Sequence, residues 1–375
     1  MTAGVYLDYN ATAPLRPEAA EAVGHSLAVI GNPSSVHRFG RLARRLLDEA
    51  RAEVAALVGA APEQIVFTSG GTEANALALS GTGRRRLLVS AGEHDSVLAA
   101  APGAQCIPLE PDGRVDLAAL DAALAKDETP ALVSVMLANN ETGVIQPLGE
   151  VVARARAHGA LVHCDAVQAA GKIPLDFGEL GVDLLTLSAH KLGGPQGVGA
   201  LVVSSDREIT PLIRGGGQEH RRRAGTENLP GIVGFGAAAR AAASLAGMER
   251  LAAWRDALER RITALAPEAV VFGRGAPRLP NTSCLALPGL AAETQVMALD
   301  LAGVAVSAGS ACSSGKVAPS HVLRAMGASE AEASSAIRVS FGWASDAGDV
   351  ESFLAAWGEL YSRKAPALGA ASPAA

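Results

Sequence analysis

Two charged side chains follow apolar runs that have the composition of buried strands. Residues 183–188 lead to Lys191, and residues 160–164 lead to Asp165. The carboxyl ends of parallel strands form the crevice in which open α/β sheets bind ligands, so we expect the two charges to lie close together. A lysine and a carboxylate so placed suit pyridoxal phosphate, which needs a Schiff-base lysine and an acid facing its pyridine nitrogen. A lysine after a strand can also be a solvated loop residue, and Ser-x-His-Lys alone is a weak motif.

A glycine turn between a strand and a helix supplies a second kind of site. A short strand at residues 65–67 leads into Gly70, Gly71 and Thr72, after which residues 74–79 have a helical pattern. The free N–H groups and the dipole at a helix N-terminus bind anions such as a phosphate. N-capping of the helix by Thr72 explains the same residues, and neither interpretation excludes the other.

Two more charged or titratable side chains have functional and structural interpretations. His94 opens a helix after a strand at residues 87–90. A helix N-terminus favours its neutral form, which suits catalysis, although a lone histidine there is more often a surface residue. Arg338, within an expected strand at residues 337–341, is either a surface charge or a clamp for a carboxylate, because its guanidinium fork binds carboxylates in a bidentate manner.

The cysteines differ in their surroundings. Cys312 lies among glycine, alanine and serine residues, so we expect an exposed and mobile thiol. Cys106, Cys164 and Cys284 lie in more apolar runs, where we expect a raised thiol pKa and blocked access. No Cys-x-x-Cys occurs, and Cys164 points away from its strand neighbours His163 and Asp165, so we predict no metal site.

The order of the predicted elements indicates the fold class. Short apolar strands alternate with helical segments between residues 65 and 204, which is typical of a parallel sheet covered by helices on both faces. An Ala-rich helix over roughly 232–265 is expected to connect two domains. We therefore predict an α/β protein with a large domain at residues 15–250 and a small domain formed by residues 1–14 and 251–363.

Composition limits the partners and the compartment. The 375 residues carry 32 basic and 38 acidic side chains, a formal charge of -6, which argues against nucleic acid as a partner. The N-terminus has no signal-peptide pattern, and no uncharged apolar run is long enough to cross a bilayer, so we expect a cytoplasmic protein without a membrane partner. Residues 364–375, which are rich in alanine and proline, are expected to be a disordered tail.

Taken together, the motifs resemble the cysteine desulfurases, which are pyridoxal-phosphate enzymes of the class V aminotransferase group. The likeness runs from residues 6–12 to residues 338–342, and the serine-rich cysteine loop resembles that of the long-loop branch. The resemblance implies the fold type I architecture, with a mainly parallel sheet in a large domain and a smaller α/β C-terminal domain. The matching segments are 69–73, 93–94, 139–143, 165–168, 188–191 and 307–312.

The resemblance also implies a role for each matching residue. Lys191 would hold the cofactor as a Schiff base, Asp165 would pair with the pyridine nitrogen, and Gln168 would reach the ring hydroxyl. His94 would stack on the ring and move protons, and Cys312 would be the nucleophile. The resemblance assigns phosphate binding to Gly71, Thr72, Ser188, His190 and, from the other subunit of a homodimer, Thr226. It assigns binding of the substrate carboxylate to Arg338 and to Asn140, which also contacts the cofactor.

The implied reaction converts L-cysteine to L-alanine and leaves a persulfide on Cys312. The sulfur would then pass to an iron-sulfur scaffold protein or to another acceptor. A selenocysteine lyase or another class V enzyme is an alternative that would share Lys191 and Asp165. Cys312 argues against a transaminase, because transamination needs no thiol. A non-enzymatic subunit that only binds the cofactor is a further alternative, against which the retention of all these groups counts.

Overall fold

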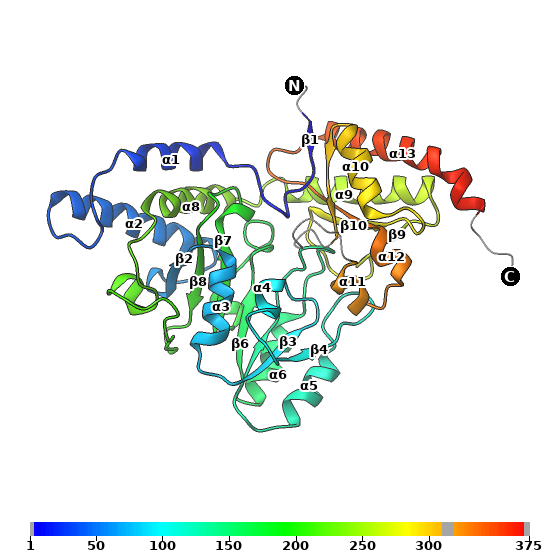
Figure 1. The fold of residues 1–375 in the computed structure, drawn as a ribbon. Helices are drawn as coiled ribbons and strands as arrows, with labels where there is room; N and C mark the ends of the chain where they lie inside the picture. Colours follow the sequence, from blue (N-terminus) through cyan, green and yellow to red (C-terminus); the bar gives the residue numbers. More distant parts are fainter. Residues whose placement is uncertain (1–3, 310–318, 371–375) are drawn as a thin grey trace.

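A seven-stranded sheet forms the centre of the larger part of the chain in the computed structural model, which describes residues 4–309 and 319–370 (Figure 1). All neighbouring strands are parallel except β8, which runs antiparallel to both of its neighbours. The expectation of a mainly parallel sheet is therefore confirmed. Across the sheet the strands are β2 (Ile65–Thr68), β8 (Gly199–Val203), β7 (Leu184–Ser188), β6 (Leu161–Asp165), β5 (Ala131–Ser134), β3 (Arg86–Ser90) and β4 (Gln105–Ile107).

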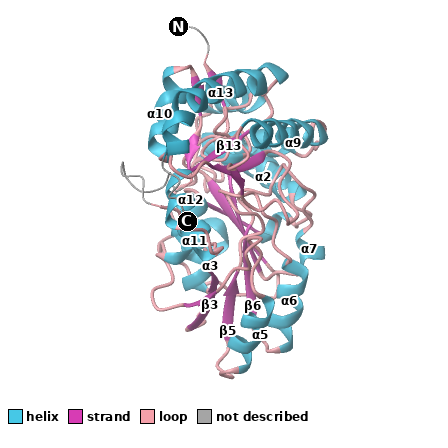
Figure 2. Cartoon of the chain, turned by 90° about the vertical axis from the view of Figure 1, so that its right-hand side faces the viewer, coloured by secondary structure: helices cyan, strands magenta, loops and turns pink. Residues whose placement is uncertain are grey.

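Helices cover both faces of this sheet, which is why its central strands are continuous apolar runs. Every residue of β5, β6, β7 and β8 is buried. Figure 2 shows α3 on one side of β3, β5 and β6, with α5 and α6 on the other. The helices of this part are α1 (Pro17–Leu27), α2 (Arg38–Leu57), α3 (Gly71–Gly81), α4 (Asp95–Leu98), α5 (Leu117–Ala125), α6 (Leu148–Ala157), α7 (Phe177–Leu180) and α8 (Leu229–Ala242).

Two smaller sheets lie beyond the carboxyl edge of the large one. One is a four-stranded antiparallel sheet in the order β12 (Ser307–Ala308), β13 (Ala336–Ser340), β10 (Thr282–Ala286) and β9 (Val270–Val271). The other pairs β1 (Val5–Tyr6) with β11 (Val304–Ala305) in parallel. The accompanying helices are α9 (Met248–Leu265), α10 (Ala292–Leu301), α11 (His321–Ala325), α12 (Glu330–Ser335) and α13 (Ala347–Ala370).

The hydrophobic core is divided in the same way as the sheets. One large cluster packs α2 and α8 against the seven-stranded sheet, whereas a separate cluster joins α9, α10 and α13 to β10 and β13 and includes Leu7 from the N-terminal segment. We propose that these are two domains with the boundaries expected from the sequence, residues 15–250 and residues 1–14 plus 251–363. No helix in the described part of the chain is long and apolar enough to span a membrane.

Two expectations about helices are wrong. The single helix expected over roughly 232–265 is two helices, α8 and α9, and Gly247 at the start of α9 has a left-handed backbone with φ 93°. Glycine adopts that conformation readily, so the chain can turn there despite its alanine content. The tail expected to be disordered from residue 364 continues as α13 to Ala370, since alanine has the highest helix propensity. Residues 371–375 lie outside the described residues.

A buried ion pair holds the loop that follows the large sheet. Arg51 on α2 and Glu219 are 4% and 5% exposed, and their closest atoms, Nη2 and Oε1, are 2.6 Å apart. Glu219 Oε2 also accepts from the backbone N–H of Phe67 on β2 at 2.9 Å. Glu219, His220 and Arg221 all have positive φ angles between 44° and 65°, a conformation that costs energy for non-glycine residues. The ion pair therefore fixes a strained turn against the edge strand.

Removal of this carboxylate should destabilise the protein strongly. Glu219→Ala leaves the buried Arg51 guanidinium without its charged partner, for which we expect a loss of about 3 to 5 kcal/mol in the free energy of unfolding. The matched control is Asp48→Ala on α2, the helix that carries Arg51. The partner of Asp48, Arg44, is about half exposed, so this variant should lose about 1 kcal/mol or less in the free energy of unfolding. Urea unfolding measures both; equal losses in the two variants would contradict the argument.

Candidate active site

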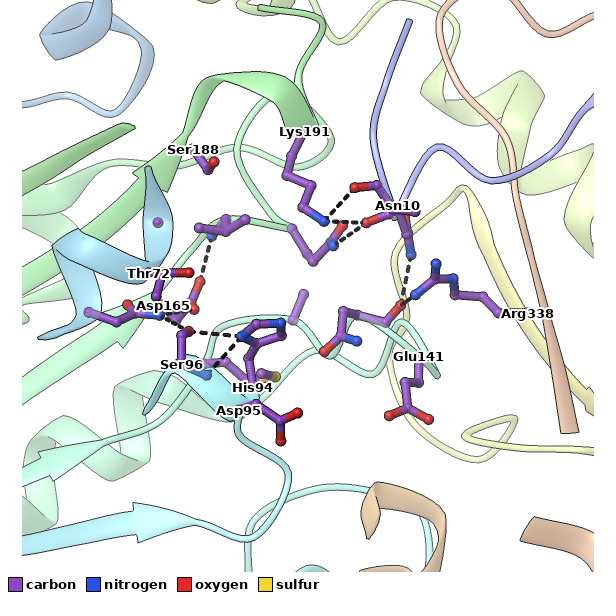
Figure 3. Close-up of a pocket in the computed structure, with 18 of the residues that line it drawn as sticks. Asn10, Thr72, His94, Asp95, Ser96, Glu141, Asp165, Ser188, Lys191 and Arg338 are labelled. Atoms are coloured by element: carbon purple, nitrogen blue, oxygen red, sulfur yellow. Dashed lines mark hydrogen bonds between the residues drawn. The ribbon is translucent and has the colours of Figure 1, made fainter. Parts of the chain in front are cut away.

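A cavity of about 570 Å³ opens where the carboxyl ends of β6 and β7 face β13 and the N-terminal segment (Figure 3). It receives residues from both the large and the smaller sheets, together with Asn10 and Ala11. Its position agrees with the general rule that α/β sheets bind ligands beyond the carboxyl ends of their strands. The expected site residues that line it are Gly71, Thr72, His94, Asn140, Asp165, Gln168, Ser188, His190, Lys191 and Arg338.

Lys191 reaches this cavity from a short 3-10 turn, Ala189–Lys191, directly after β7. Its Nζ donates hydrogen bonds to the carbonyl oxygens of Asn10 at 2.6 Å and Ala11 at 2.9 Å. Both acceptors belong to the N-terminal segment, so that segment orients the lysine amine. The side chain is half-buried and is therefore not the solvated loop lysine that the sequence left open.

Asp165 is the last residue of β6, next to β7, and its side chain is held by two donors. Asn75 Nδ2 on α3 donates to Asp165 Oδ2 at 2.8 Å, and the Val167 backbone N–H donates to Oδ1 at 2.9 Å. The same Asn75 Nδ2 donates to Ser96 Oγ at 2.9 Å. The carboxylate is 7% exposed, so it lies in the wall of the cavity with its orientation fixed.

His94 is the N-cap residue of α4, and its ring is oriented by Ser96. The Ser96 backbone N–H lies 3.1 Å from His94 Nδ1, and the Ser96 hydroxyl lies 2.8 Å from the same atom. A backbone N–H can only donate, so Nδ1 is an acceptor and carries no proton in this geometry. Asp165, Asn75, Ser96 and His94 thus form one chain of hydrogen bonds, which Figure 3 shows along one wall of the cavity.

The glycine turn forms another wall. The N-cap of α3 is Gly70, not Thr72 as one interpretation of the sequence had it, and a glycine has no side chain with which to cap the first turn. The first turn of α3 therefore has no side-chain cap, as in helix N-termini that bind anions, and its residues Gly71 and Thr72 line the cavity. A Cβ atom at Gly71 would come 3.2 Å from Val167 Cγ2 and 3.5 Å from Ser188 Cβ, so α3 begins in close contact with the strand ends.

His190 lies between this wall and the N-terminal segment. Its Nδ1 is 3.2 Å from Thr12 Oγ1. Burial, and to a smaller extent the charge of Lys191, lower the pKa of His190 to about 4. A neutral ring can offer one N–H donor to an anion at neutral pH.

Arg338 enters the cavity from β13 on the opposite side. It is 3% exposed, so the alternative of a surface charge is wrong. Its Nη2 lies 2.8 Å from Asp8 Oδ1, and its Nη1 donates to the Asn140 carbonyl oxygen at 3.0 Å. These contacts fix the guanidinium plane, and Nε has no hydrogen-bond partner among the residues described.

Glu141, next to Asn140 in the loop after β5, is a buried acid that the sequence did not single out. It lines the cavity and is 2% exposed, and its Oε2 has no hydrogen-bond partner in the described part of the chain. Burial raises the pKa of Glu141 to about 7, although Ser320, Arg338 and His94 act in the opposite direction. Figure 3 shows this carboxyl group below Arg338.

Two of the expected site residues are not among the described residues that line the cavity: the phosphate residue Thr226 and the nucleophile Cys312. Thr226 is exposed and lies outside the cavity lining, and Cys312 lies outside the described residues. Cys164 and Cys284 are buried, and burial raises the pKa of both thiols, as expected. Cys106 is exposed on the edge strand β4, so the expectation that its access is blocked is wrong. No group of side chains suited to a metal ion occurs among the residues described.

Comparison with known proteins identifies the family of this chain. The family model "Aminotransferase class-V" matches residues 5–353. A cysteine desulfurase from Cereibacter sphaeroides is 46% identical over 93% of this chain and 94% of its own. The chain belongs to the cysteine desulfurases. A NifS-like protein from Rickettsia africae superposes with a TM-score of 0.89 at 36% identity, covering 96% of this chain and 99% of that one. A structure titled "SspA in complex with cysteine" superposes with a TM-score of 0.79 at 30% identity, covering 90% of this chain and 98% of that one.

The structure of this family member also brings together residues that sequence reasoning assigned no role. Asn75 and Ser96 join Asp165 to His94, and Asn10 contacts the Lys191 amine. Asn10 lies in the N-terminal segment that carries the family resemblance, which is a signal that could have identified it. Nothing in the sequence distinguishes Asn75, because polar residues are common in the first turns of helices.

Glu141 should make stability depend on pH. Its pKa of about 7 lies above the ordinary value of 4.5, so the folded protein binds this proton more tightly than the unfolded chain does. The favourable contribution is complete below about pH 4.5 and is lost as pH rises to about 7. Glu141→Gln, which cannot ionise, should therefore lose less stability over that range, by an amount on the order of 3 kcal/mol.

Urea unfolding of both proteins at several pH values measures this difference. The comparison of wild type with the variant isolates Glu141, because all other titrating groups are shared. Parallel curves for the two proteins would show that Glu141 titrates at its ordinary pKa.

Proposed function

We propose that this protein is a pyridoxal-phosphate-dependent cysteine desulfurase that converts L-cysteine to L-alanine and leaves the sulfur on Cys312 as a persulfide. The observation that carries the proposal is the convergence of Lys191 and Asp165 on one cavity with an uncapped helix N-terminus beside them. Family membership supports the same activity, since curated relatives above 40% identity are named cysteine desulfurases.

The side chains around the cavity fit pyridoxal phosphate in charge and hydrogen bonding. The first turn of α3, with Thr72, Ser188 and His190, offers donors to a phosphate, and Gly71 lines the cavity without a side chain. The Asp165 carboxylate would face the pyridine nitrogen, which it keeps protonated. We propose that Lys191 holds the cofactor, and that His94 stacks on its ring while Gln168 and Asn140 contact the ring substituents.

When bound, the cofactor supplies an electron sink for the α-carbon of an amino acid. Lys191 then serves as the base that takes the proton from the substrate's α-carbon. The orientation of His94, with Nδ1 fixed as an acceptor, leaves Nε2 as the ring atom that can exchange a proton with the ligand.

Arg338 and Asn140 would hold the substrate's carboxylate on the side of the cavity formed by β13. The Arg338 guanidinium is already oriented by Asp8, so little side-chain entropy is lost on binding. The Cys312 thiolate attacks the substrate sulfur, which forms the S–S bond and breaks the bond between sulfur and Cβ. The electron pair of that bond stays with Cβ, which takes up one proton, and the return of the proton held by Lys191 to the α-carbon completes alanine.

The persulfide is useful only when its outer sulfur passes to an acceptor. We propose an iron-sulfur scaffold protein or another sulfur-accepting protein as the partner, and a reducing, cytoplasmic compartment that keeps thiols available. We also propose a homodimer in which Thr226 completes the phosphate site of the other subunit. The exposure of Thr226, and of the large apolar side chains Leu27, Ile30 and Val36, supports this assembly.

Lys191→Ala should lose both the visible absorbance and the covalently held cofactor, because it lacks the amine. The measurement is borohydride reduction in the presence of pyridoxal phosphate followed by peptide mass analysis. Lys126→Ala, which removes an exposed lysine, should keep the colour and the label of the wild type. A unique cofactor-labelled peptide that persists in Lys191→Ala would refute the assignment.

Cys312→Ser should bind the cofactor and L-cysteine like the wild type but should form no persulfide. A serine hydroxyl is barely ionised near neutral pH, so we expect sulfide release with a thiol reductant to fall by at least about 100-fold. Cys106→Ser, which removes the exposed thiol on β4, should keep full activity. Persulfide labelling read by peptide mass gives the acceptor directly; a label on Cys106, or sulfide release that survives in Cys312→Ser, would overturn the mechanism.

A further inference from the structure

One amide on α3 joins two parts of the candidate site. Asn75 lines the cavity and is 1% exposed. Its Nδ2 donates to Asp165 Oδ2 at 2.8 Å and to Ser96 Oγ at 2.9 Å. These two contacts use both N–H groups of the amide nitrogen. The reaction proposed above gives Asn75 no task.

The orientation of the Asn75 amide follows from the carboxylate. A carboxylate oxygen can only accept a hydrogen bond, so the amide nitrogen must face Asp165. The amide oxygen, Oδ1, is buried and has no hydrogen-bond partner among the residues described, which is costly. Turning the amide over would set this oxygen against a carboxylate oxygen. The Asn75 side chain therefore serves Asp165 at the expense of its own oxygen.

Asp165 has a second donor, the Val167 backbone N–H, but that contact is local. Val167 lies two residues along the chain and donates to Oδ1 at 2.9 Å, so it moves with the strand end that carries the carboxylate. Asn75 lies 90 residues away in the sequence and donates to the other oxygen. Of these two donors, Asn75 is the one that ties the Asp165 side chain to another element of the fold.

That element also carries the turn that we expect to bind a phosphate. Gly71 and Thr72 lie in the first turn of α3, which has no side-chain cap, and both line the cavity. Gly71 and Asn75 are four residues apart, so they lie on the same face of the helix. One helix therefore presents to the cavity both an anion site and the support of the Asp165 carboxylate.

We propose that Asn75 is a positioning residue that holds the Asp165 carboxylate in register with the first turn of α3, so that the pyridine nitrogen and the phosphate of pyridoxal phosphate are bound together. The proposal rests on the cofactor proposed above. A carboxylate that is fixed before binding loses little freedom when the cofactor arrives. A rigid ring whose phosphate is held at α3 cannot shift to follow a carboxylate that has turned away.

A comparison of pyridoxal phosphate with pyridoxal, which lacks the phosphate, tests the proposal by calorimetry on the cofactor-free protein. In Asn75→Leu, whose side chain has a similar size and no donor, we expect the affinity for pyridoxal phosphate to fall by about tenfold or more. Pyridoxal can shift with the carboxylate, so its affinity should fall much less. Inorganic phosphate, a probe of α3 alone, should bind as in the wild type. Ser80→Ala, which removes an exposed hydroxyl from the same helix, should change none of these affinities.

An unchanged affinity for pyridoxal phosphate, or equal losses for the two aldehydes, overturns the proposal. A loss of inorganic phosphate binding also overturns it, because Asn75 would then merely support the helix. Asn75→Leu should cause no further loss when it is added to Asp165→Ala, and a further loss would count against positioning. Should Asn75→Leu fail to fold, Asn75→Ser gives the same test, because its hydroxyl is too short to reach Asp165. A wild-type protein that binds no pyridoxal phosphate would instead refute the proposed cofactor.

Discussion

The site depends on Asn10, whose backbone and side chain join the two halves of the molecule. Its carbonyl oxygen accepts from Lys191 and Gln168 of the large part, while its N–H donates to Ser340 Oγ on β13. Its side-chain Nδ2 donates to Thr282 Oγ1 on β10. Each of these polar groups is buried or nearly so, where an unmade hydrogen bond costs about 1 to 3 kcal/mol. The N-terminal segment therefore joins the Lys191 side of the cavity to β10 and β13.

The electrostatics of the cavity suit an anionic ligand. Two basic side chains, Lys191 and Arg338, line the cavity. The Asp165 carboxylate is turned toward Asn75. Burial raises the pKa of Glu141 to about 7, so the Glu141 carboxyl group is largely protonated below that pH. Arg338 is paired with Asp8, so the groups that remain for a phosphate or a substrate carboxylate are Lys191, the neutral His190 ring and the uncapped first turn of α3.

Local patterns in the sequence predicted the central sheet and the strand-end residues, because those features depend on near neighbours. The apolar runs before Lys191 and Asp165 are long enough to indicate strands, and parallel strand ends converge by geometry. Local patterns could not predict the contacts of Asn10, because its partners on β10 and β13 are 272 and 330 residues away. The exposure of Cys106 was missed for a related reason, since it depends on β4 being the edge strand.

The distance in sequence between Asn10 and its partners also sets the order of events during synthesis. Residues 5–12 are made long before Ser340, which follows Asn10 by 330 residues. Domains generally fold as units as they are made, so the seven-stranded sheet can form while Asn10 still lacks its partners on β10 and β13. Closure of the site is then a late, long-range step, because Arg338 and Ser340 on β13 are made after every strand of the seven-stranded sheet.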